Sequence, residues 1–390
     1  MLAESKRENA VASPVKITRV DAWALRARIG QPVETSFGIM RDRPAVFVRV
    51  EDAGGAFGFG EIWCNFPGCG AEHRVRLATG EIGPLLVGSE FASPAEAFAV
   101  LTDKVRIRVL QSAEVGPYRQ AIAGIDIALW DLAARKAGKP LAALLDDAPA
   151  ADVPVYASGI HIGAAPEMTA RARASGYRAF KVKVGFGLEK DVAGLRDVAA
   201  GLQPGERLFT DANQAWSLAQ SLDFARAAKD LPLGWLEEPM PADACAADWG
   251  RLAAEGGIPL AAGENMAGDS EFRAAIHGGA FAYIQPDVAK WGGVSRCFPA
   301  ARAILDGGRT YCPHFLGGGI GLAASAHLLA AAGGPGLLEV DANSNPLREA
   351  FEFAAPRDGS ITLPQEAGLG IEEIPAGIRG CVTLHQSWPG

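Results

Sequence analysis

The chain has 390 residues, of which 49% are hydrophobic and 21% are charged, and its formal net charge is −8. This is the composition of a globular protein that is long enough for one large core and a smaller domain. The negative charge, and the lack of basic runs interleaved with aromatic residues, exclude a nucleic-acid partner. No apolar run reaches the roughly 18 residues of a membrane span, so we expect no membrane segment.

The cysteines and the N-terminus bear on the cellular compartment. Six cysteines are scattered along the chain, and only Cys64 and Cys69 lie close together, without a second pair or a histidine set to complete a zinc site. Residues 1–10 are polar, lack the apolar core of a signal peptide, and are expected to form a loose tail. We therefore expect a cytoplasmic protein with reduced thiols.

Residues 16–140 have the pattern of an α+β domain. Alternating apolar residues predict a three-stranded antiparallel meander, and apolar residues at three- and four-residue steps predict three helices after it. The predicted strands cover residues 15–20, 45–50 and 56–62, and the predicted helices cover 71–86, 93–105 and 116–137. A long segment, Ile29 to Pro44, separates the first two strands and is expected to help select the substrate.

Residues 150–351 alternate strand-like runs with Ala-rich helical stretches. Eight such runs predict a (β/α) barrel that follows the first domain as the catalytic domain. A doubly wound sheet is the rival fold, but Gly159 to Gly163 does not supply the Gly-rich phosphate loop that it needs after the first strand. Residues 352–390 contain one more strand-like piece and are expected to pack back on the first domain.

Three carboxylates end three successive predicted strands. They are Asp211, Glu237 and Glu264, and their spacings are 237 − 211 = 26 and 264 − 237 = 27. A strand, a crossover helix and two loops fill such a spacing, so the three acids are expected at one face of the barrel. Their mutual repulsion indicates a hard divalent cation between them, Mg²⁺ first. Glu238 is expected to point away from that cation, because side chains alternate along a strand.

Two lysines and an Asp–His pair follow the same architecture. Lys181 and Lys183 share one side of the second barrel strand, and each is expected to lower the pKa of the other towards that of a general base. Asp287 ends the sixth strand and His314 the seventh, with 314 − 287 = 27, so the carboxylate is placed to hold the imidazole in one tautomer. Glu339 ends the eighth strand and is expected to face the metal site across the pocket.

In combination these motifs resemble the enolase superfamily and, within it, the mandelate-racemase-like subgroup of the mandelate racemase/muconate lactonizing enzyme family. The resemblance covers the chain from about residue 16, and Asp287, where the muconate-lactonizing subgroup has Lys, decides the subgroup. It implies an enolase-type modified TIM barrel with an N-terminal α+β capping domain. It also implies one Mg²⁺ per subunit on Asp211, Glu237 and Glu264, and opposed bases at Lys183 and His314.

The resemblance further assigns substrate binding to Asn213, Lys181 and Glu339, with Glu339 bonded to the substrate carboxylate or the enediolate. The implied reaction begins with removal of the proton α to a carboxylate. The sequence does not decide which reaction follows the removal of this proton. We expect dehydration of a hydroxy acid or sugar acid to a 2-keto acid, with racemisation or epimerisation of a 2-substituted acid as the alternative. A barrel that binds a ligand without catalysis is the remote alternative.

Substrate contacts and assembly are predicted from the remaining patterns. Polar candidates are Asn65 and either Arg41 or Arg43, and apolar candidates are Trp63, Phe66 and Phe37. The segment from Asp341 to Asn345, after the eighth strand, is expected to contribute as well. Ala-rich helices with apolar faces favour a homo-oligomer whose size the sequence does not define.

Overall fold

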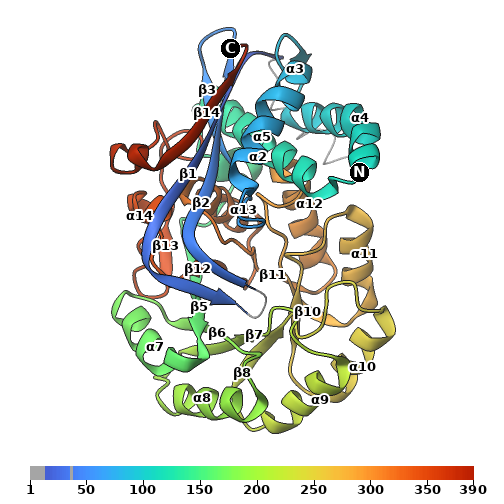
Figure 1. Cartoon of the computed structure of the whole chain (residues 1–390), viewed down its shortest axis with the longest axis vertical. Coiled ribbons are helices and arrows are strands. Elements are labelled where there is room, and N and C mark those ends of the chain that lie inside the picture. Colours follow the sequence, from blue (N-terminus) through green and yellow to red (C-terminus); the bar gives the residue numbers. More distant parts are fainter. Residues whose placement is uncertain (1–13, 36–37) are drawn as a thin grey trace.

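The structure is a computed structural model and describes residues 14–35 and 38–390. Figure 1 shows two parts, a cap made largely of the N-terminal region and a barrel built from the middle of the chain. The expected tail at residues 1–10 and Phe37 lie outside the described residues.

The cap is an antiparallel sheet covered by helices. Its strands pair in the order β14–β1–β2–β3, so the last strand of the chain lies beside the first, and a short strand β4 also pairs with β1. The strands are β1 (Val15–Thr35), β2 (Gly38–Asp52), β3 (Phe57–Ile62), β4 (Glu90–Phe91) and β14 (Val382–Trp388). The sequence suggested a loop over residues 29–44, but residues 29–35 and 38–44 belong to β1 and β2 and extend this strand pair towards the barrel.

The cap helices pack on one face of this sheet. They are α2 (Gly70–Arg76), the π-helical segment η1 (Leu77–Ile82), α3 (Gly83–Leu86), α4 (Pro94–Ser112) and α5 (Val115–Lys136). Helix α5 approaches β3 very closely, because Gly60 of β3 has no Cβ. A Cβ at that position would lie 2.0 Å from the carbonyl oxygen of Gly124 in α5.

The barrel contains eight parallel strands in the order β11–β10–β9–β8–β7–β6–β5–β12. A backbone bond of 3.3 Å from the Glu339 amide to the Pro313 carbonyl joins the two ends of this order. The strands are β5 (Asp152–His161), β6 (Ala179–Lys183), β7 (Arg207–Asp211), β8 (Leu233–Glu237), β9 (Leu260–Ala262), β10 (Phe281–Ile284), β11 (Thr310–Tyr311) and β12 (Leu338–Asp341). The predicted enolase-type barrel with a cap is therefore confirmed.

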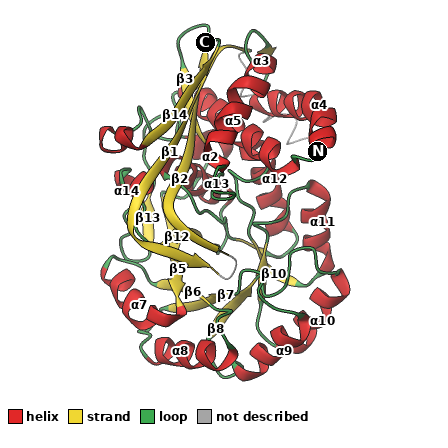
Figure 2. Cartoon of the chain, in the orientation of Figure 1, coloured by secondary structure: helices red, strands yellow, loops and turns green. Residues whose placement is uncertain are grey.

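Helices surround the barrel strands, as Figure 2 shows in red. They are α7 (Ala165–Ala174), α8 (Leu188–Ala200), α9 (Leu218–Ala227), α10 (Ala246–Gly256), α11 (Asp269–Gly278), α12 (Gly293–Asp306) and α13 (Gly319–Ala332). Shorter elements are α6 (Leu141–Leu145), η2 (Ile162–Ala164), α14 (Pro346–Glu349), η3 (Glu352–Ala354), β13 (Ser360–Thr362) and η4 (Ala376–Cys381). Strand β13 pairs with β5 of the barrel, whereas β14 returns to the cap sheet.

The interior of the barrel below its carboxyl-end face is closed by aromatic side chains. Trp235 and Phe209 stack with their ring centroids 3.7 Å apart, and Tyr156 packs edge-on against both. These rings fill the barrel, so the only open face for a ligand among the described strands is the one below the cap.

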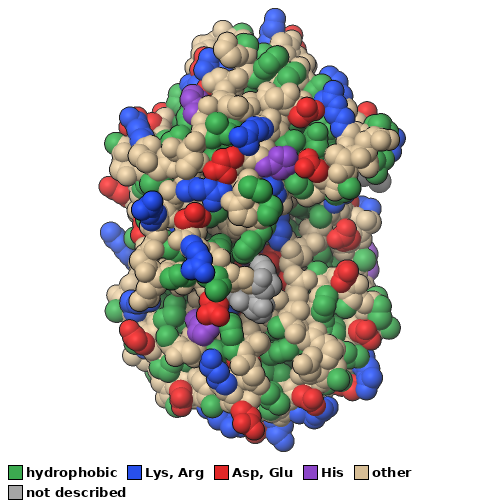
Figure 3. Space-filling view, viewed as in Figure 1, with side chains coloured by type: hydrophobic (Ala, Val, Ile, Leu, Met, Phe, Trp, Pro, Cys, Tyr) green, Lys and Arg blue, Asp and Glu red, His purple; other side chains and the backbone are tan. Residues whose placement is uncertain are grey.

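On the face shown in Figure 3, basic and acidic side chains are interspersed, and the residues described there form no broad basic surface. Within residues 14–35 and 38–390, no helix combines the length and apolar character that crossing a membrane requires.

Candidate active site

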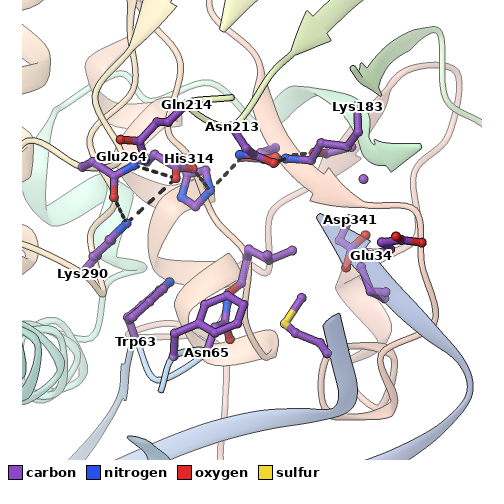
Figure 4. Close-up of a pocket in the computed structure, with 18 of the residues that line it drawn as sticks. Glu34, Trp63, Asn65, Lys183, Asn213, Gln214, Glu264, Lys290, His314 and Asp341 are labelled. Carbon is purple, nitrogen blue, oxygen red and sulfur yellow. Dashed lines mark hydrogen bonds and ion pairs between the residues drawn. The ribbon is translucent and has the colours of Figure 1, made fainter. Parts of the chain in front are cut away.

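A cavity of about 530 Å³ lies between the carboxyl ends of the barrel strands and the cap. The barrel contributes charged and polar side chains, and the cap contributes mostly apolar ones. The barrel residues include Ser158, Lys183, Asn213, Glu264, Lys290, His314, Glu339 and Asp341, and the cap residues are Val33, Glu34, Met40, Trp63, Asn65, Phe66 and Pro67. Figure 4 shows these side chains projecting into the cavity from both parts.

The three predicted metal ligands come from neighbouring strands. Asp211 and Glu237 are the last residues of β7 and β8 and are partners in register, and Glu264 follows the next strand, β9. Asp211 and Glu237 are fully buried, and the Glu264 side chain is 16% exposed. The 26- and 27-residue spacing thus brings three acids to one face, as expected for parallel strands.

In this structure each of the three carboxylates faces a cation. Asp211 accepts a hydrogen bond of 2.5 Å from Lys183, Glu237 accepts one from Lys181, and Glu264 Oε2 lies 2.6 Å from His314 Nε2. Among the described residues, no three Asp, Glu, His or Cys side chains are arranged around one point as metal ligands would be.

The chemistry of the donor set nevertheless fits a hard divalent cation. Burial, together with the charges of Asp211 and Glu339, raises the pKa of Glu237 to about 8, although Lys181 opposes this rise. Burial and the charge of Glu264 likewise raise the pKa of Glu238 well above its ordinary value. Buried carboxylates that repel one another are the oxygen-rich setting that Mg²⁺ neutralises.

Glu238 does not point away from the acidic cluster. The strand ends at Glu237, and Glu238 has φ +35°, so the alternation of side chains does not continue through it. Its Oε2 accepts a hydrogen bond of 2.8 Å from Asn265 Nδ2, which also donates to Glu264 at 3.0 Å. Glu237 instead faces the barrel interior, where Gln285 Nε2 donates at 2.7 Å and Trp235 Nε1 at 3.1 Å.

The two lysines differ in their surroundings. Lys181 is fully buried, contacts Glu237, and lies 2.9 Å from Glu339 Oε1 and 3.6 Å from Asp211 Oδ2. Lys183 lines the cavity and donates to Asn213 Oδ1 at 2.7 Å as well as to Asp211. The expected lowering of the lysine pKa values is wrong for this structure. Burial and the neighbouring lysine lower the pKa of Lys183, but Asp211, Glu237 and Glu339 together outweigh them, and the pKa is raised.

His314 is held on both ring nitrogens. Its Nδ1 lies 2.7 Å from Asp287 Oδ2, and its Nε2 lies 2.6 Å from Glu264 and 3.5 Å from Glu339. Burial lowers the pKa of His314, but Glu264 and Glu339 outweigh burial and raise it well above its ordinary value. Asp287 is itself fixed by the backbone amides of Ala289 and Lys290, at 2.9 and 3.0 Å.

Glu339 lines the cavity, and its Oε2 lies 3.5 Å from the same His314 nitrogen that Glu264 contacts. Ser158 donates its hydroxyl to Glu339 Oε1. In Figure 4, Asn213 lies between His314 and Lys183.

The predicted substrate contacts divide into two groups. Trp63, Asn65 and Phe66 line the cavity, and Asn65 also donates a hydrogen bond of 2.8 Å to the Leu316 carbonyl. Neither arginine lines it, because Arg41 is exposed and Arg43 is buried in an ion pair with Asp341.

Lys290 is a cavity residue that the sequence interpretation left without a role. Its Nζ donates to Asn265 Oδ1 at 2.6 Å and lies 4.9 Å from the centre of the Trp63 ring. Its position three residues after Asp287, just beyond a strand end, is the signal that could have suggested it.

The comparison with family models decides what kind of protein this is. Residues 17–146 match the model described as mandelate racemase/muconate lactonizing enzyme, N-terminal domain, and residues 164–375 match the enolase C-terminal domain-like model. The chain belongs to the mandelate racemase/muconate lactonizing enzyme family. The predicted family and the prediction that the chain is an enzyme are therefore confirmed, since named members are dehydratases, cycloisomerases and racemases.

Individual members of the family show the range of its reactions. A D-galactarolactone cycloisomerase from Agrobacterium fabrum is 30% identical over 92% of this chain and 96% of its own. An arabinonate dehydratase from Saccharolobus solfataricus is 26% identical over 90% of this chain and 91% of its own.

Solved structures of the family superpose closely on this one. A mandelate racemase/muconate lactonizing enzyme from Bordetella bronchiseptica has a TM-score of 0.90 and 47% identity, covering 95% of this chain and all of its own. An L-talarate dehydratase from Polaromonas, solved with Mg and L-glucarate, has a TM-score of 0.81 and 26% identity, with 96% and 99% coverage.

Proposed function

We propose that the protein removes the α-proton of a small hydroxy acid or sugar acid and then expels a β-hydroxyl group, giving a 2-keto acid. The observation that carries this proposal is that two residues suited to proton transfer, Lys183 at the end of β6 and His314 after β11, line one cavity. Each is oriented by a buried carboxylate, Asp211 for Lys183 and Asp287 for His314.

We propose that Asp211, Glu237 and Glu264 hold one Mg²⁺. Bound there, the ion would stabilise the negative charge that develops on the substrate carboxylate as the α-proton leaves. A magnesium-containing family structure with 26% identity supports this assignment.

The protein's own groups divide the remaining work. We propose that Lys181 and Glu339, which are 2.9 Å apart, bind the carboxylate end of the substrate together with Asn213. Because Asp287 holds His314 Nδ1, the Nε2 atom is the one that faces the cavity and exchanges a proton. We propose that one of the Lys183–His314 pair takes the α-proton and the other protonates the leaving hydroxyl.

The polar lining favours dehydration of a polyhydroxy acid. Glu34, Asn65, Ser158 and Asp341 also line the cavity and offer partners for hydroxyls. Racemisation or epimerisation is the second candidate, since two groups on different sides of one carbon also permit reprotonation from the opposite face. A relative that is 26% identical is an N-succinyl-L-Arg/Lys racemase.

The test is proton NMR in D₂O of a panel of hydroxy acids with the protein and Mg²⁺. We expect α-proton exchange and formation of a keto acid, and both should stop when the ion is chelated. An epimer of the acid would instead identify an epimerase, and a cyclised product would identify a cycloisomerase. His314→Asn and Lys183→Ala should each reduce turnover by about 10²–10⁴-fold. The exposed residues His277 and Lys190 provide matched controls, His277→Asn and Lys190→Ala. No exchange with any acid would favour the non-catalytic binding role.

Two further proposals concern assembly and compartment. The Ala-rich barrel helices support a homo-oligomer, which light scattering at micromolar concentration would test, and a monomeric mass would contradict it. All six cysteines are unpaired in the structure, which supports a reducing compartment, the cytoplasm.

A further inference from the structure

Glu61, a cap residue, binds the barrel helix that follows His314. It stands near the end of β3 and is 2% exposed. Its Oε1 accepts a hydrogen bond of 2.5 Å from the Gly318 amide, and its Oε2 accepts one of 2.8 Å from the Gly321 amide. These amides belong to the first turn of α13, so the carboxylate occupies the N-terminus of that helix, where a negative charge is favoured.

Asp126, on cap helix α5, makes the corresponding contact with the helix that follows Asp287. It is 1% exposed, and its two oxygens accept hydrogen bonds from the backbone amide and the hydroxyl of Ser295, at 2.9 and 2.6 Å. Ser295 lies in the first turn of α12, which begins at Gly293.

Glycines in the barrel make room for both cap carboxylates. A Cβ on Gly317 would lie 2.7 Å from Glu61 Oε1, and one on Gly318 would lie 3.0 Å from it. A Cβ on Gly293, whose φ is +55°, would lie 2.3 Å from Asp126 Oδ2. The glycine-rich turns after Asp287 and His314 are therefore shaped around side chains from the other part of the protein.

We propose that Glu61 and Asp126 are positioning residues through which the cap sets the placement of His314 and Asp287. The proposal rests on the proposed function, in which these two residues act as a proton-transfer pair. Gly318 is four residues from His314, and the Leu316 carbonyl between them is held by Asn65 of the cap. A shift of about 1 Å in such a segment is enough to reduce a rate about 100-fold.

The electrostatic cost of these contacts supports a role beyond simple packing. Burial raises the pKa of Glu61 to about 7 and that of Asp126 to about 7, despite the backbone amides that favour the charged forms. An apolar side chain at either position would avoid that cost but would leave the amides of α12 or α13 without their acceptors.

Asp131 provides a matched control on the same cap helix. It is fully buried, burial raises its pKa to about 6, and it accepts hydrogen bonds from the amides of Phe59 and Leu369. It therefore shares the burial and charge of the two positioning residues, but it binds neither the turn after Asp287 nor the turn after His314.

The experiment compares Glu61→Gln, Asp126→Asn and Asp131→Asn with the wild-type protein at pH 8, where Glu61 is ionised. Amide hydrogen exchange followed by mass spectrometry should show lost protection at residues 314–321 in Glu61→Gln and at residues 287–295 in Asp126→Asn. Asp131→Asn should lose protection at neither segment. If Glu61→Gln does not fold, Glu61→Asp, which keeps the charge but is too short to reach both amides, takes its place.

The second measurement is α-proton exchange of the two C2 epimers of the substrate, each of which presents its proton to one of the two groups. Glu61→Gln and Asp126→Asn should slow transfer at the His314 face about 10- to 100-fold and leave transfer at the Lys183 face within about twofold. Equal losses at both faces, or unchanged protection of the two segments, would overturn the proposal. If the wild-type protein exchanges the α-proton of no acid, the proposed function is refuted instead. The amide-exchange result alone would then decide whether Glu61 and Asp126 set the placement of His314 and Asp287.

Discussion

Replacement of Glu61 by Gln should change how the stability of the protein depends on pH. Burial raises the pKa of Glu61 from 4.5 to about 7, the amides of Gly321 and Gly318 oppose this rise, and the charge of Asp287 adds to it. A carboxyl group with a higher pKa in the folded state binds more protons there, so the free energy of unfolding falls as pH rises from about 4.5 to about 7. A shift of about 2.5 pKa units corresponds to about 3 kcal/mol. Gln at this position cannot ionise and removes that dependence.

The assay is urea unfolding of the wild-type and Glu61→Gln proteins between pH 5 and pH 8 at one fixed protein concentration. The difference between their free energies of unfolding should shift in favour of the variant by about 3 kcal/mol as pH rises. The pKa of Asp131 is raised to about 6 from 3.8. The change in relative stability between wild type and Asp131→Asn should therefore be complete about one pH unit lower than the change for Glu61→Gln. A difference between wild type and Glu61→Gln that stays constant across this range would refute the reasoning.

Two other predictions concern the metal and the acid side of the stability curve. Glu237→Gln should weaken Mg²⁺ binding by more than about tenfold in calorimetric titration, because loss of a residue that only hydrogen-bonds to a metal ligand already lowers metal affinity about tenfold or more. A larger loss of affinity in Glu238→Gln would show that Glu238, and not Glu237, is the ligand. Burial lowers the pKa of His327 to about 4 from 6.5, so this residue contributes stability above about pH 6.5 that is lost as pH falls towards 4. In His327→Asn, the free energy of unfolding should fall by about 3 kcal/mol less than in the wild type between pH 6.5 and pH 4. The same acid dependence in both proteins would contradict this role of His327.

The barrel and the positions of the acids could be predicted because they depend on local patterns and one regular period. In a parallel barrel every strand ends at the same face, so a constant spacing is sufficient to place Asp211, Glu237 and Glu264 on neighbouring strands. The same reasoning places His314 one unit after Asp287, and the structure brings their side chains to 2.7 Å.

Side-chain direction at the strand ends could not be predicted in this way. The alternation rule holds within a strand, but Glu238 lies just past the end of β8 with a positive φ and turns into the acidic cluster. The pKa of Lys183 depends on the balance between burial and Lys181, which lower it, and the neighbouring carboxylates, chiefly Asp211, which raise it. A spacing in the sequence contains no distance with which to judge that balance. The antiparallel pairing of residues 33–35 with residues 38–40 was hidden because Gly30, Pro32 and Gly38 interrupt the alternation of this segment.

Contacts between the cap and the barrel could not be predicted from the sequence either. These contacts connect substrate selection with the geometry of proton transfer. One short stretch of the cap contributes Glu61 to the start of α13, Trp63 to Lys290, and Asn65 to the loop after His314. Trp63 and Asn65 also line the cavity. A substitution in this stretch that reshapes the cavity for another acid therefore also shifts the loop that carries His314. For this reason the cap cannot be treated as an independent specificity module on an unchanging barrel.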